Sequence, residues 1–376
     1  MNSVYINKIA KFLPNEPISN SEMEDVLGKI GGKPSRARRI ILRSNGIKQR
    51  YYAIDKEQNI NYNNTQITAN AIRNLNIDLD SIETLSCGTT LPDQIMPNHA
   101  VMVHGELKSK PCEVVATSGI CLAGITALKN AYLSVKAEEV STAVATGSEV
   151  VSTLLHAKNF KAESEFNEAE FEKRPEIAFE KDFLRWMLSD GAGAILLQNQ
   201  PNKNSLSLEI KWIEISSFAN EFEACMYAGC EKIDGEIKGY REFTQEQWLE
   251  QSLFTIKQDV KLLNANIVNI TVQRTLERAL EKRDIKANDI SWFLPHYSSE
   301  FFRDEVYQSL VDANFEIPKE RWFTNLTSCG NTGSASIYIM LEELFNSNRL
   351  TKGEKILCYV PESGRFSSSF TLLEVV

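Results

Sequence analysis

The sequence predicts an α/β fold built from two similar halves. Short apolar runs alternate with helical patterns along most of the 376 residues, as expected when a largely buried sheet lies between helices. In addition, a strand-like run in each half leads through a polar turn into a helix. A chain of this length is too long for one simple core. We therefore expect an N-terminal half at 1–200 and a C-terminal half at 201–376.

The predicted elements of the two halves follow the same plan. The first half is expected to contain strands in residues 82–90, 112–119, 141–151 and 193–198 and helices in 65–75 and 121–137. The second half is expected to contain helices in residues 266–283 and 332–348 and strands in 290–297, 355–363 and 368–376. Sequence identity between the halves is too weak to prove duplication.

A charged segment with aromatic residues at intervals, residues 154–190, interrupts this pattern. One interpretation is a solvated surface insertion. The other is a cap over a substrate channel, because loops of this length in compact domains are often lids.

Composition and charge exclude several classes of protein. The net charge of −9 and the pI near 5.3 argue against a nucleic-acid-binding surface over the whole protein. No window approaches 18 apolar residues, so we expect no membrane span, and residues 1–17 lack the features of a secretory signal. The seven cysteines lack CxxC spacing, which favours free thiols in the cytoplasm over disulfides or a metal site.

Cys121 is the first candidate for chemistry, because it lies where a strand-like run gives way to a helix. The positive end of a helix dipole favours the thiolate and so raises nucleophilicity. The small residues Ala123 and Gly124 follow and leave room for a substrate. A buried structural cysteine remains an alternative, since such cysteines are common.

His296 and Asn331 are the other candidates. His296 ends a strand-like run, and open α/β sheets place their sites at strand ends. Asn331 lies in the turn "CGNTGSAS". Taken alone, the histidine is compatible with an ordinary loop residue and the asparagine with a helix cap or turn residue.

The motifs "ATSGICLAGITAL", "SDGAGAILL", "LPH" and "GNTGSASI", in this order and at these separations, resemble the β-ketoacyl-acyl-carrier-protein synthase III family of the thiolase superfamily. The resemblance covers essentially the whole chain. It implies a thiolase fold, which is a duplicated five-layer αβαβα arrangement with two mixed sheets, and a homodimer.

The resemblance also implies roles for the candidate residues. Cys121 matches the acyl-accepting cysteine, and His296 and Asn331 match the other members of a Cys-His-Asn triad. The thiolate would attack a thioester to give an acyl-enzyme, with the backbone N–H groups of Cys121 and Gly364 as the oxyanion hole. His296 and Asn331 would donate hydrogen bonds to the enolate of the second substrate. No cofactor is implied, because the substrates are carried on acyl carrier protein or coenzyme A.

The chain departs from the common family pattern in several places, one of which is the near-invariant glycine triplet close to the C-terminus, which appears as "SGR". Ile40 and Ser44 occupy positions where a tryptophan and an arginine usually hold the coenzyme A adenine, although Arg43 is adjacent. This favours substrates bound to a carrier protein. "HYSS" replaces "HQAN". Met96 matches a phenylalanine that the partner subunit inserts into the acyl pocket, and a methionine there suits a longer or differently shaped chain; plain interface packing is the alternative.

The segments at residues 32–53 and 86–107 look most similar to ketosynthases of dialkylresorcinol and flexirubin-type pigment clusters. This implies Claisen condensation of a β-ketoacyl thioester with a second, often unsaturated, acyl thioester, followed by ring closure to a 2,5-dialkylcyclohexane-1,3-dione. The alternatives are fatty-acid initiation with malonyl-carrier protein and an acyltransferase that forms an ester or amide. A non-catalytic partner subunit is disfavoured, because the triad is intact.

Carrier proteins are acidic, so a protein of net charge −9 needs a local basic surface to bind one. The candidates near the N-terminal motif and just after His296 are Arg36, Arg39, Arg43, Lys48, Arg50 and Arg303. Glu149, in "TGSEVV", is either a base of the site or only a strand-end residue.

Overall fold

The computed structural model describes residues 2–35, 38–160 and 184–376. Its centre is a nine-stranded mixed sheet in the order β13-β14-β15-β8-β1-β7-β6-β4-β5. The strands are β1 (Tyr5–Phe12), β4 (Thr84–Thr89), β5 (Glu113–Ser118), β6 (Thr142–Glu149), β7 (Gly191–Gln198), β8 (Leu208–Ser217), β13 (Ile290–Pro295), β14 (Lys355–Glu362) and β15 (Ser367–Val375).

The two separate sheets expected from the sequence are joined into one. Strand β1 pairs antiparallel with β8 through Tyr5 opposite Glu209 and Ile6 opposite Leu208. Because each strand would otherwise end its sheet with unpaired backbone groups, this short pairing removes two open edges. Within the joined sheet, β4 runs parallel to β5 and β6, and β13 runs parallel to β14.

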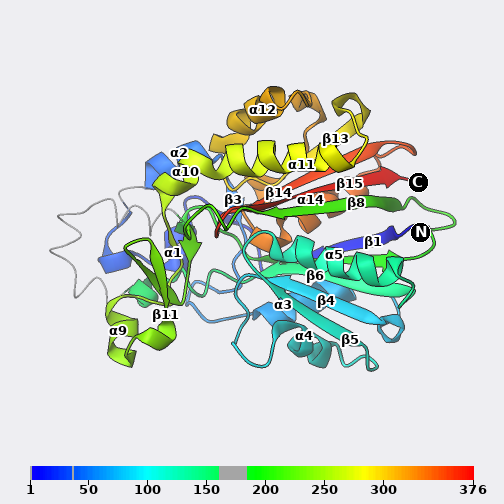
Figure 1. The fold of residues 1–376 in the computed structure, drawn as a ribbon. Helices are drawn as coiled ribbons and strands as arrows, with labels where there is room; N and C mark the ends of the chain where they lie inside the picture. The colour runs from blue at the N-terminus through cyan, green and yellow to red at the C-terminus, as the bar shows by residue number, and fades with distance from the viewer. Residues whose placement is uncertain (1, 36–37, 161–183) are drawn as a thin grey trace.

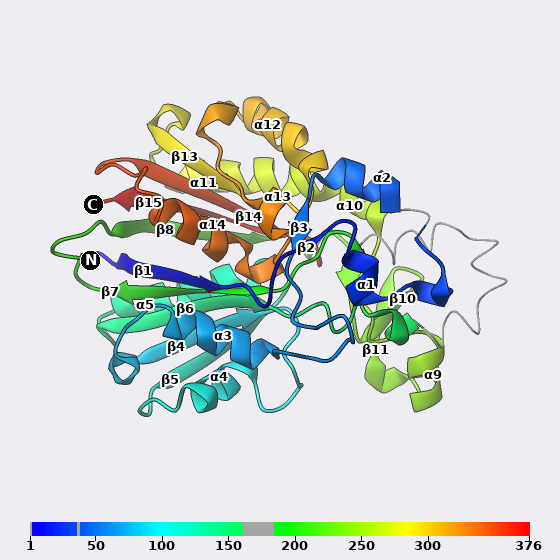
Figure 2. The ribbon, with the colours of Figure 1, turned by 180° about the vertical axis from the view of Figure 1, so that it is seen from behind.

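Helices lie on both outer sides of this sheet and between its two halves (Figures 1 and 2). In the N-terminal half, α3 (Asn64–Arg73) and α4 (His99–Leu107) cover the outer face. In the C-terminal half, the outer face is covered by α10 (Val260–Val268), a π-helical segment (Asn269–Arg274), α11 (Thr275–Lys282) and α12 (Arg303–Asp312). Between the halves lie α5 (Ala123–Lys136) and α14 (Ser336–Phe345).

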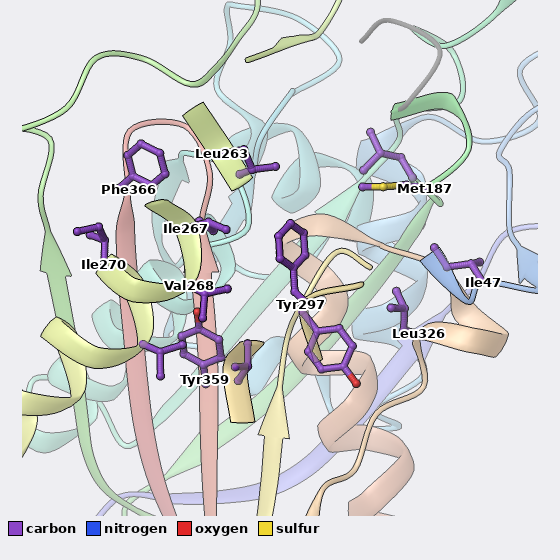
Figure 3. Close-up of a cluster of buried hydrophobic side chains, with 14 of the residues drawn as sticks. Ile47, Met187, Leu263, Ile267, Val268, Ile270, Tyr297, Leu326, Tyr359 and Phe366 are labelled. Atoms are coloured by element: carbon purple, nitrogen blue, oxygen red, sulfur yellow. The ribbon is translucent and has the colours of Figure 1, made fainter. Parts of the chain in front are cut away.

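The buried apolar side chains divide into three large clusters that follow these layers. One lies under α3 and α4, one surrounds α5 and α14, and the largest lies on the outer face of the C-terminal half. Figure 3 shows part of the largest cluster, where side chains of α10 and β14 and Tyr297 point toward one another. This cluster continues into the wall of the active-site cavity described below.

The strands and helices predicted by residue range are present. The strand expected to lead into the turn at Asn331 is instead the short helix Leu326–Cys329, and several elements were not anticipated. The sequence reading missed β1 and β8, the two strands that join the halves. It also missed a small unit between residues 218 and 259. The remaining short elements are α1 (Met23–Leu27), α2 (Arg38–Asn45), α9 (Gln245–Glu250), α13 (Leu326–Cys329), β2 (Ile18–Ser19), β3 (Gln49–Arg50), β9 (Met226–Tyr227), β10 (Cys230–Ile233), β11 (Glu236–Gly239) and β12 (Lys257–Gln258).

The predicted insertion at 154–190 is described only at its two ends, because residues 161–183 lie outside the described part of the chain. A 3₁₀ turn, Ala157–Phe160, forms one end, and the buried residues from Leu184 onward form the other. Over the described ranges, no helix is both long enough and apolar enough to cross a membrane.

Close backbone packing at two glycines fixes α5 and α14 against the sheet. A Cβ atom added to Gly124 of α5 would lie 2.4 Å from the carbonyl oxygen of Ser334, and one added to Gly147 of β6 would lie 2.3 Å from the same oxygen. Tyr338 of α14 donates its hydroxyl to the carbonyl of Gly124 at 2.7 Å. The glycines therefore allow the turn before α14 to lie directly on α5 and β6.

We expect Gly147→Ala to lower the free energy of unfolding by about 3 kcal/mol, because overpacking of a tight core costs roughly 1–3 kcal/mol and the clash is with backbone. Gly105→Ala is the matched control, since a Cβ there meets nothing within 4 Å and the residue lies inside α4. That change should stabilise by about 0.5–1 kcal/mol. Urea unfolding of both variants measures the difference, and equal effects would contradict this packing argument.

Candidate active site

A cavity of about 610 Å³ opens where the carboxyl ends of the parallel strands of both halves meet. Thr90 follows β4, Cys121 follows β5 and Glu149 ends β6, while His296 follows β13 and Glu362 ends β14. Open α/β sheets place their sites at such strand ends. Cys121, His296, Asn331 and Gly364, which the sequence predicted to act together, all line this one cavity.

Cys121 lies in the turn that leads into α5 and is 8% exposed. The turn before it contains Gly119 at φ +149°, and Thr117 donates its hydroxyl to the carbonyl of Ala123 at 2.8 Å. Burial, together with the nearby charges of Glu149 and Glu362, raises the pKa of the Cys121 thiol. From the sequence, the helix dipole was expected to lower the pKa of Cys121. In this cavity the desolvation of the thiol raises that pKa by more than the dipole lowers it. The resting residue is therefore a thiol that must lose its proton as it attacks.

His296 is held in place by its backbone N–H, which donates to the carbonyl of Tyr359 at 2.8 Å. Its side chain is 4% exposed, and burial lowers its pKa to about 4. At neutral pH the ring is uncharged and offers one N–H donor. Within the described ranges no hydrogen bond occupies this ring, so the donor is available to a ligand in the cavity.

Asn331 is fixed through three of its polar atoms. Its N–H donates to the carbonyl of Met187 at 3.1 Å, and its carbonyl accepts from the N–H of Ser189 at 2.8 Å. Its side-chain Oδ1 accepts from the N–H of Gly333 at 3.0 Å. This last bond settles which way the amide faces and leaves Nδ2 without a partner among the described residues. Asn331 therefore presents a second neutral donor to the cavity that His296 also lines.

Gly364 does not present the free oxyanion donor that the sequence predicted. Its N–H donates to Oε1 of Glu362 at 2.5 Å. The position itself is close to the nucleophile, because a Cβ added to Gly364 would lie 3.0 Å from Ile120 Cδ1. In this structure the side chain of Glu362 thus engages the N–H donor that the predicted oxyanion hole requires. Glu362 was missed from the sequence, although it ends the predicted strand 355–363.

Glu149 is a second carboxyl in the cavity and is 2% exposed. Its Oε1 accepts from the N–H of Thr90 at 3.0 Å, from the Thr90 hydroxyl, and from the N–H of Ser334 at 3.4 Å. Its Oε2 is buried without a partner. Burial raises its pKa to about 7, although these hydrogen bonds oppose the shift.

The unit at residues 218–259 forms a wall of the cavity that sequence reasoning missed. Its alternating pattern is short and irregular, so it gave no clear periodic signal. The N–H groups of Cys225 and Met226 donate to the carbonyl of Gly364 at 2.7 and 3.3 Å, which fastens this unit to the turn after β14. Its lining residues are mostly apolar: Ala224, Met226, Tyr227, Ala228, Cys230, Ile237, Ile256 and Gln258.

One predicted docking residue is wrong. Arg50 has no exposed surface, because its guanidinium donates to Asn20 Oδ1 and to the carbonyl of Trp186, both at 2.5 Å, inside the protein. Arg36 lies outside the described residues. Arg39, Arg43 and Lys48 are exposed, and Arg303 is half-buried, 3.7 Å from Glu300.

Met96 does not line the cavity of its own chain and is 82% exposed beside the exposed Ile95. Its predicted role in a partner's pocket stays a prediction. No cluster of three or more metal-ligating side chains occurs within residues 2–35, 38–160 and 184–376.

The chain is similar in sequence to known synthases. The family model for the C-terminal part of 3-oxoacyl-[acyl-carrier-protein] synthase III matches residues 280–366. A β-ketoacyl-[acyl-carrier-protein] synthase III of Clostridium perfringens is 26% identical over 312 residues, which is 83% of each chain.

Two solved structures share the fold over 99% of both chains. The tetronic acid condensing enzyme AbyA1 has a TM-score of 0.74 at 17% identity. OleA of Xanthomonas campestris, solved with lauric acid and lauroyl-CoA, has a TM-score of 0.72 at 18% identity.

The chain has a thiolase-like α/β fold. It is a condensing enzyme, an acyltransferase, that is similar to β-ketoacyl-acyl-carrier-protein synthase III. These matches do not distinguish the dialkylresorcinol type within that class. The roles of the individual site residues also stay predictions, as does the division of the chain near residue 200.

We expect Glu149 to make stability fall as pH rises. In the folded protein the pKa of this carboxyl is raised to about 7, so the folded chain keeps the proton over a pH range in which the unfolded chain has released it. The stabilisation of the folded state is therefore complete below the unfolded pKa of 4.5 and is lost as the pH rises through about 7. The loss relative to Glu149→Gln should be about 3 kcal/mol between pH 4.5 and 7.5.

Urea unfolding of both proteins across this pH range measures the effect. His296 acts in the opposite direction, because its lowered pKa makes stability rise with pH. Both proteins contain His296, so its contribution cancels when the wild type is compared with Glu149→Gln. Parallel stability curves for the two proteins would contradict a protonated Glu149 in the folded state.

Proposed function

We propose that this protein is a ketosynthase of the dialkylresorcinol type. It condenses a β-ketoacyl thioester with a second, often unsaturated, acyl thioester through an acyl-enzyme on Cys121. Claisen condensation, an intramolecular Michael-type closure and loss of the carboxyl group then give a 2,5-dialkylcyclohexane-1,3-dione. Acyl carrier protein delivers the substrates.

The main observation in support of this function is that a buried thiol and two neutral hydrogen-bond donors line the same largely apolar cavity. Cys121 supplies the thiol, and His296 and Asn331 supply the donors. Two donors without charge stabilise a developing enolate without binding an anion tightly in the ground state. An acyltransferase that forms an ester or amide needs no second oxyanion of this kind.

The dimensions of the cavity support acyl chains rather than an acetyl group. At about 610 Å³ it lies within the range of sites that enclose drug-sized ligands, whereas fatty-acid initiation with a short primer requires much less space. The structurally similar OleA binds lauric acid and lauroyl-CoA, and we infer that this chain accommodates acyl chains of comparable kind.

The two steps use the residues in turn. In the first, the Cys121 sulfur attacks the thioester carbonyl, the carrier thiol leaves with the proton of Cys121, and an acyl-enzyme forms. In the second, the enolate of the other thioester forms with its oxygen on His296 and Asn331 and attacks the acyl-enzyme. The new C–C bond forms as the C–S bond of Cys121 breaks.

Loss of either donor should block the second step alone. We expect His296→Ala and Asn331→Asp to lower product formation by about 100-fold, the usual cost of one oxyanion donor, while an acyl group still accumulates on Cys121. Asn331→Asp keeps the shape of the side chain and removes its N–H donors.

Incubation with β-ketoacyl and α,β-unsaturated thioesters, followed by mass spectrometry of small molecules after mild alkali, tests the product. A cyclic dione survives alkali, whereas an ester does not. An alkali-labile product from the wild type would identify an oxygen acyltransferase instead.

The exposed basic residues suit a docking site for the carrier. Helix α2, which contains Arg39 and Arg43, packs beside the 3₁₀ turn Glu300–Phe302 and Arg303. Ser299 donates its hydroxyl to the carbonyl of Ser44 at 3.4 Å. Because Phe302 lines the cavity, this basic surface lies next to a wall of the site.

We expect Arg43→Glu and Lys48→Glu to raise KM for carrier-bound acyl thioesters by about 10-fold, because charge reversal weakens steering of an acidic partner. KM for small thioester mimics should stay unchanged. Lys352→Glu, at an exposed site in the turn before β14, is the control for overall charge. Equal losses with both kinds of substrate would contradict docking at this surface.

The homodimer implied by the resemblance belongs to this proposal as well. The exposed Ile95 and Met96 form an apolar tip that is suited to insertion into a second copy.

A further inference from the structure

Two carboxyl groups lie in the cavity, and the condensation described above uses neither. Glu149 is fixed by donors from Thr90 and Ser334. Glu362 accepts hydrogen bonds from the backbone N–H groups of Gly364 at 2.5 Å, Ser367 at 3.2 Å and Arg365 at 3.4 Å, and the side chain of Ser367 also hydrogen-bonds it. It is 8% exposed and has no ion pair within the described ranges.

Glu362 lies close to the nucleophile. Its charge contributes to the raised pKa of Cys121. A Cβ added to Gly364 would lie 2.2 Å from Glu362 Oε1 and 3.0 Å from Cδ1 of Ile120, the residue before Cys121. Glu362 and the turn that carries the nucleophile therefore lie against the same glycine, and Glu362 and Cys121 line the same cavity.

The charges around the cavity disfavour an anionic second substrate. Glu149 and Glu362 both line it, and Arg365 is the single cationic residue among the described residues that do so. Arg365 is exposed, and its Nε donates to the carbonyl of Phe222. A malonyl carboxylate brought beside the Glu362 carboxylate would be repelled, and Glu149, whose pKa is raised to about 7, adds to this repulsion only where it has lost its proton. An uncharged acyl thioester would not, but it releases no carbon dioxide and must lose a Cα proton to a base.

We propose that Glu362 is that base, a catalytic residue that removes the Cα proton of a second substrate which is not decarboxylated. This inference rests on the proposed function. The C–H bond breaks, the proton moves to the Glu362 carboxylate, and the electron pair forms the enolate held by His296 and Asn331. The enolate carbon bonds to the acyl carbon on Cys121, the C–S bond breaks, and the thiolate takes the proton back from Glu362.

Protonation of Glu362 also frees the oxyanion hole. A carboxylate accepts hydrogen bonds much more strongly than a carboxylic acid does, so the bond from the Gly364 N–H weakens once Glu362 is neutral. That N–H then becomes available to the tetrahedral oxyanion that forms in the next step. Removal of the Cα proton and formation of the oxyanion hole are in this way coupled through one side chain.

The test separates proton removal from acyl transfer. In D₂O at pH 6, deuterium incorporation at Cα of a β-ketoacyl thioester above the rate without enzyme is followed by rapid quench and mass spectrometry. Glu362→Gln should lower this exchange and the condensation by about 100-fold, the usual contribution of a general base. It should leave acylation of Cys121 within about threefold. Glu362→Asp should restore part of the exchange, and Glu320→Gln, at an exposed site that does not line the cavity, is the control that should keep it.

A malonyl thioester provides a second readout, because decarboxylation forms the enolate without a base. With this substrate Glu362→Gln should match or exceed the wild type, a result that misfolding cannot produce. Exchange at the wild-type rate in Glu362→Gln would overturn the assignment of the base. Absence of any condensation by the wild type, with Glu362-dependent exchange intact, would instead refute the proposed function.

Discussion

The site depends on one close contact between backbones, in which the carbonyl of Ser334 lies against Gly124 and Gly147. Any side chain at either glycine would come within 2.4 Å of that oxygen. Gly124 belongs to the helix that follows Cys121, and Ser334 follows Asn331 by three residues. The contact therefore holds the nucleophile of one half and the amide donor of the other at a fixed separation. The hydroxyl of Tyr338 on the Gly124 carbonyl reinforces it, and the pairing of β1 with β8 joins the same two halves at the sheet.

Burial then determines the protonation states that the chemistry uses. Desolvation raises the pKa of the Cys121 thiol, lowers that of His296 to about 4 and raises that of Glu149 to about 7. The resting site consequently holds a thiol and a neutral imidazole, with Glu362 bonded to the N–H of Gly364. A neutral donor pair suits an enolate better than a charged one does, since charge develops only in the transition state. The same burial means that every proton removed must go to a group inside the cavity.

The sequence predicted the parts of the structure that have strong local signals. Cys121 and His296 follow the strands β5 and β13, and Asn331 lies in the turn between α13 and a 3₁₀ turn. The structure brings all three to one cavity. The strands β1 and β8 were missed because they are defined mainly by a long-range pairing that joins the two halves. No local sequence pattern reveals such a pairing. Arg50 was wrongly placed on a surface because its neighbours are basic and exposed; only the tertiary structure shows that Asn20 and Trp186 enclose it. The occupied N–H of Gly364 likewise depends on how the chain turns after β14, which composition does not determine.

The central claim is that Cys121 carries the acyl group, and intact-protein mass spectrometry tests it most directly. Wild type and Cys121→Ala are mixed with acetyl, medium-chain saturated, α,β-unsaturated and β-ketoacyl thioesters, each on coenzyme A and on carrier protein. The account predicts an adduct on the wild type alone, from unsaturated or β-ketoacyl donors on carrier protein and not from acetyl-coenzyme A. An adduct that persists in Cys121→Ala, or none from any donor, would contradict it.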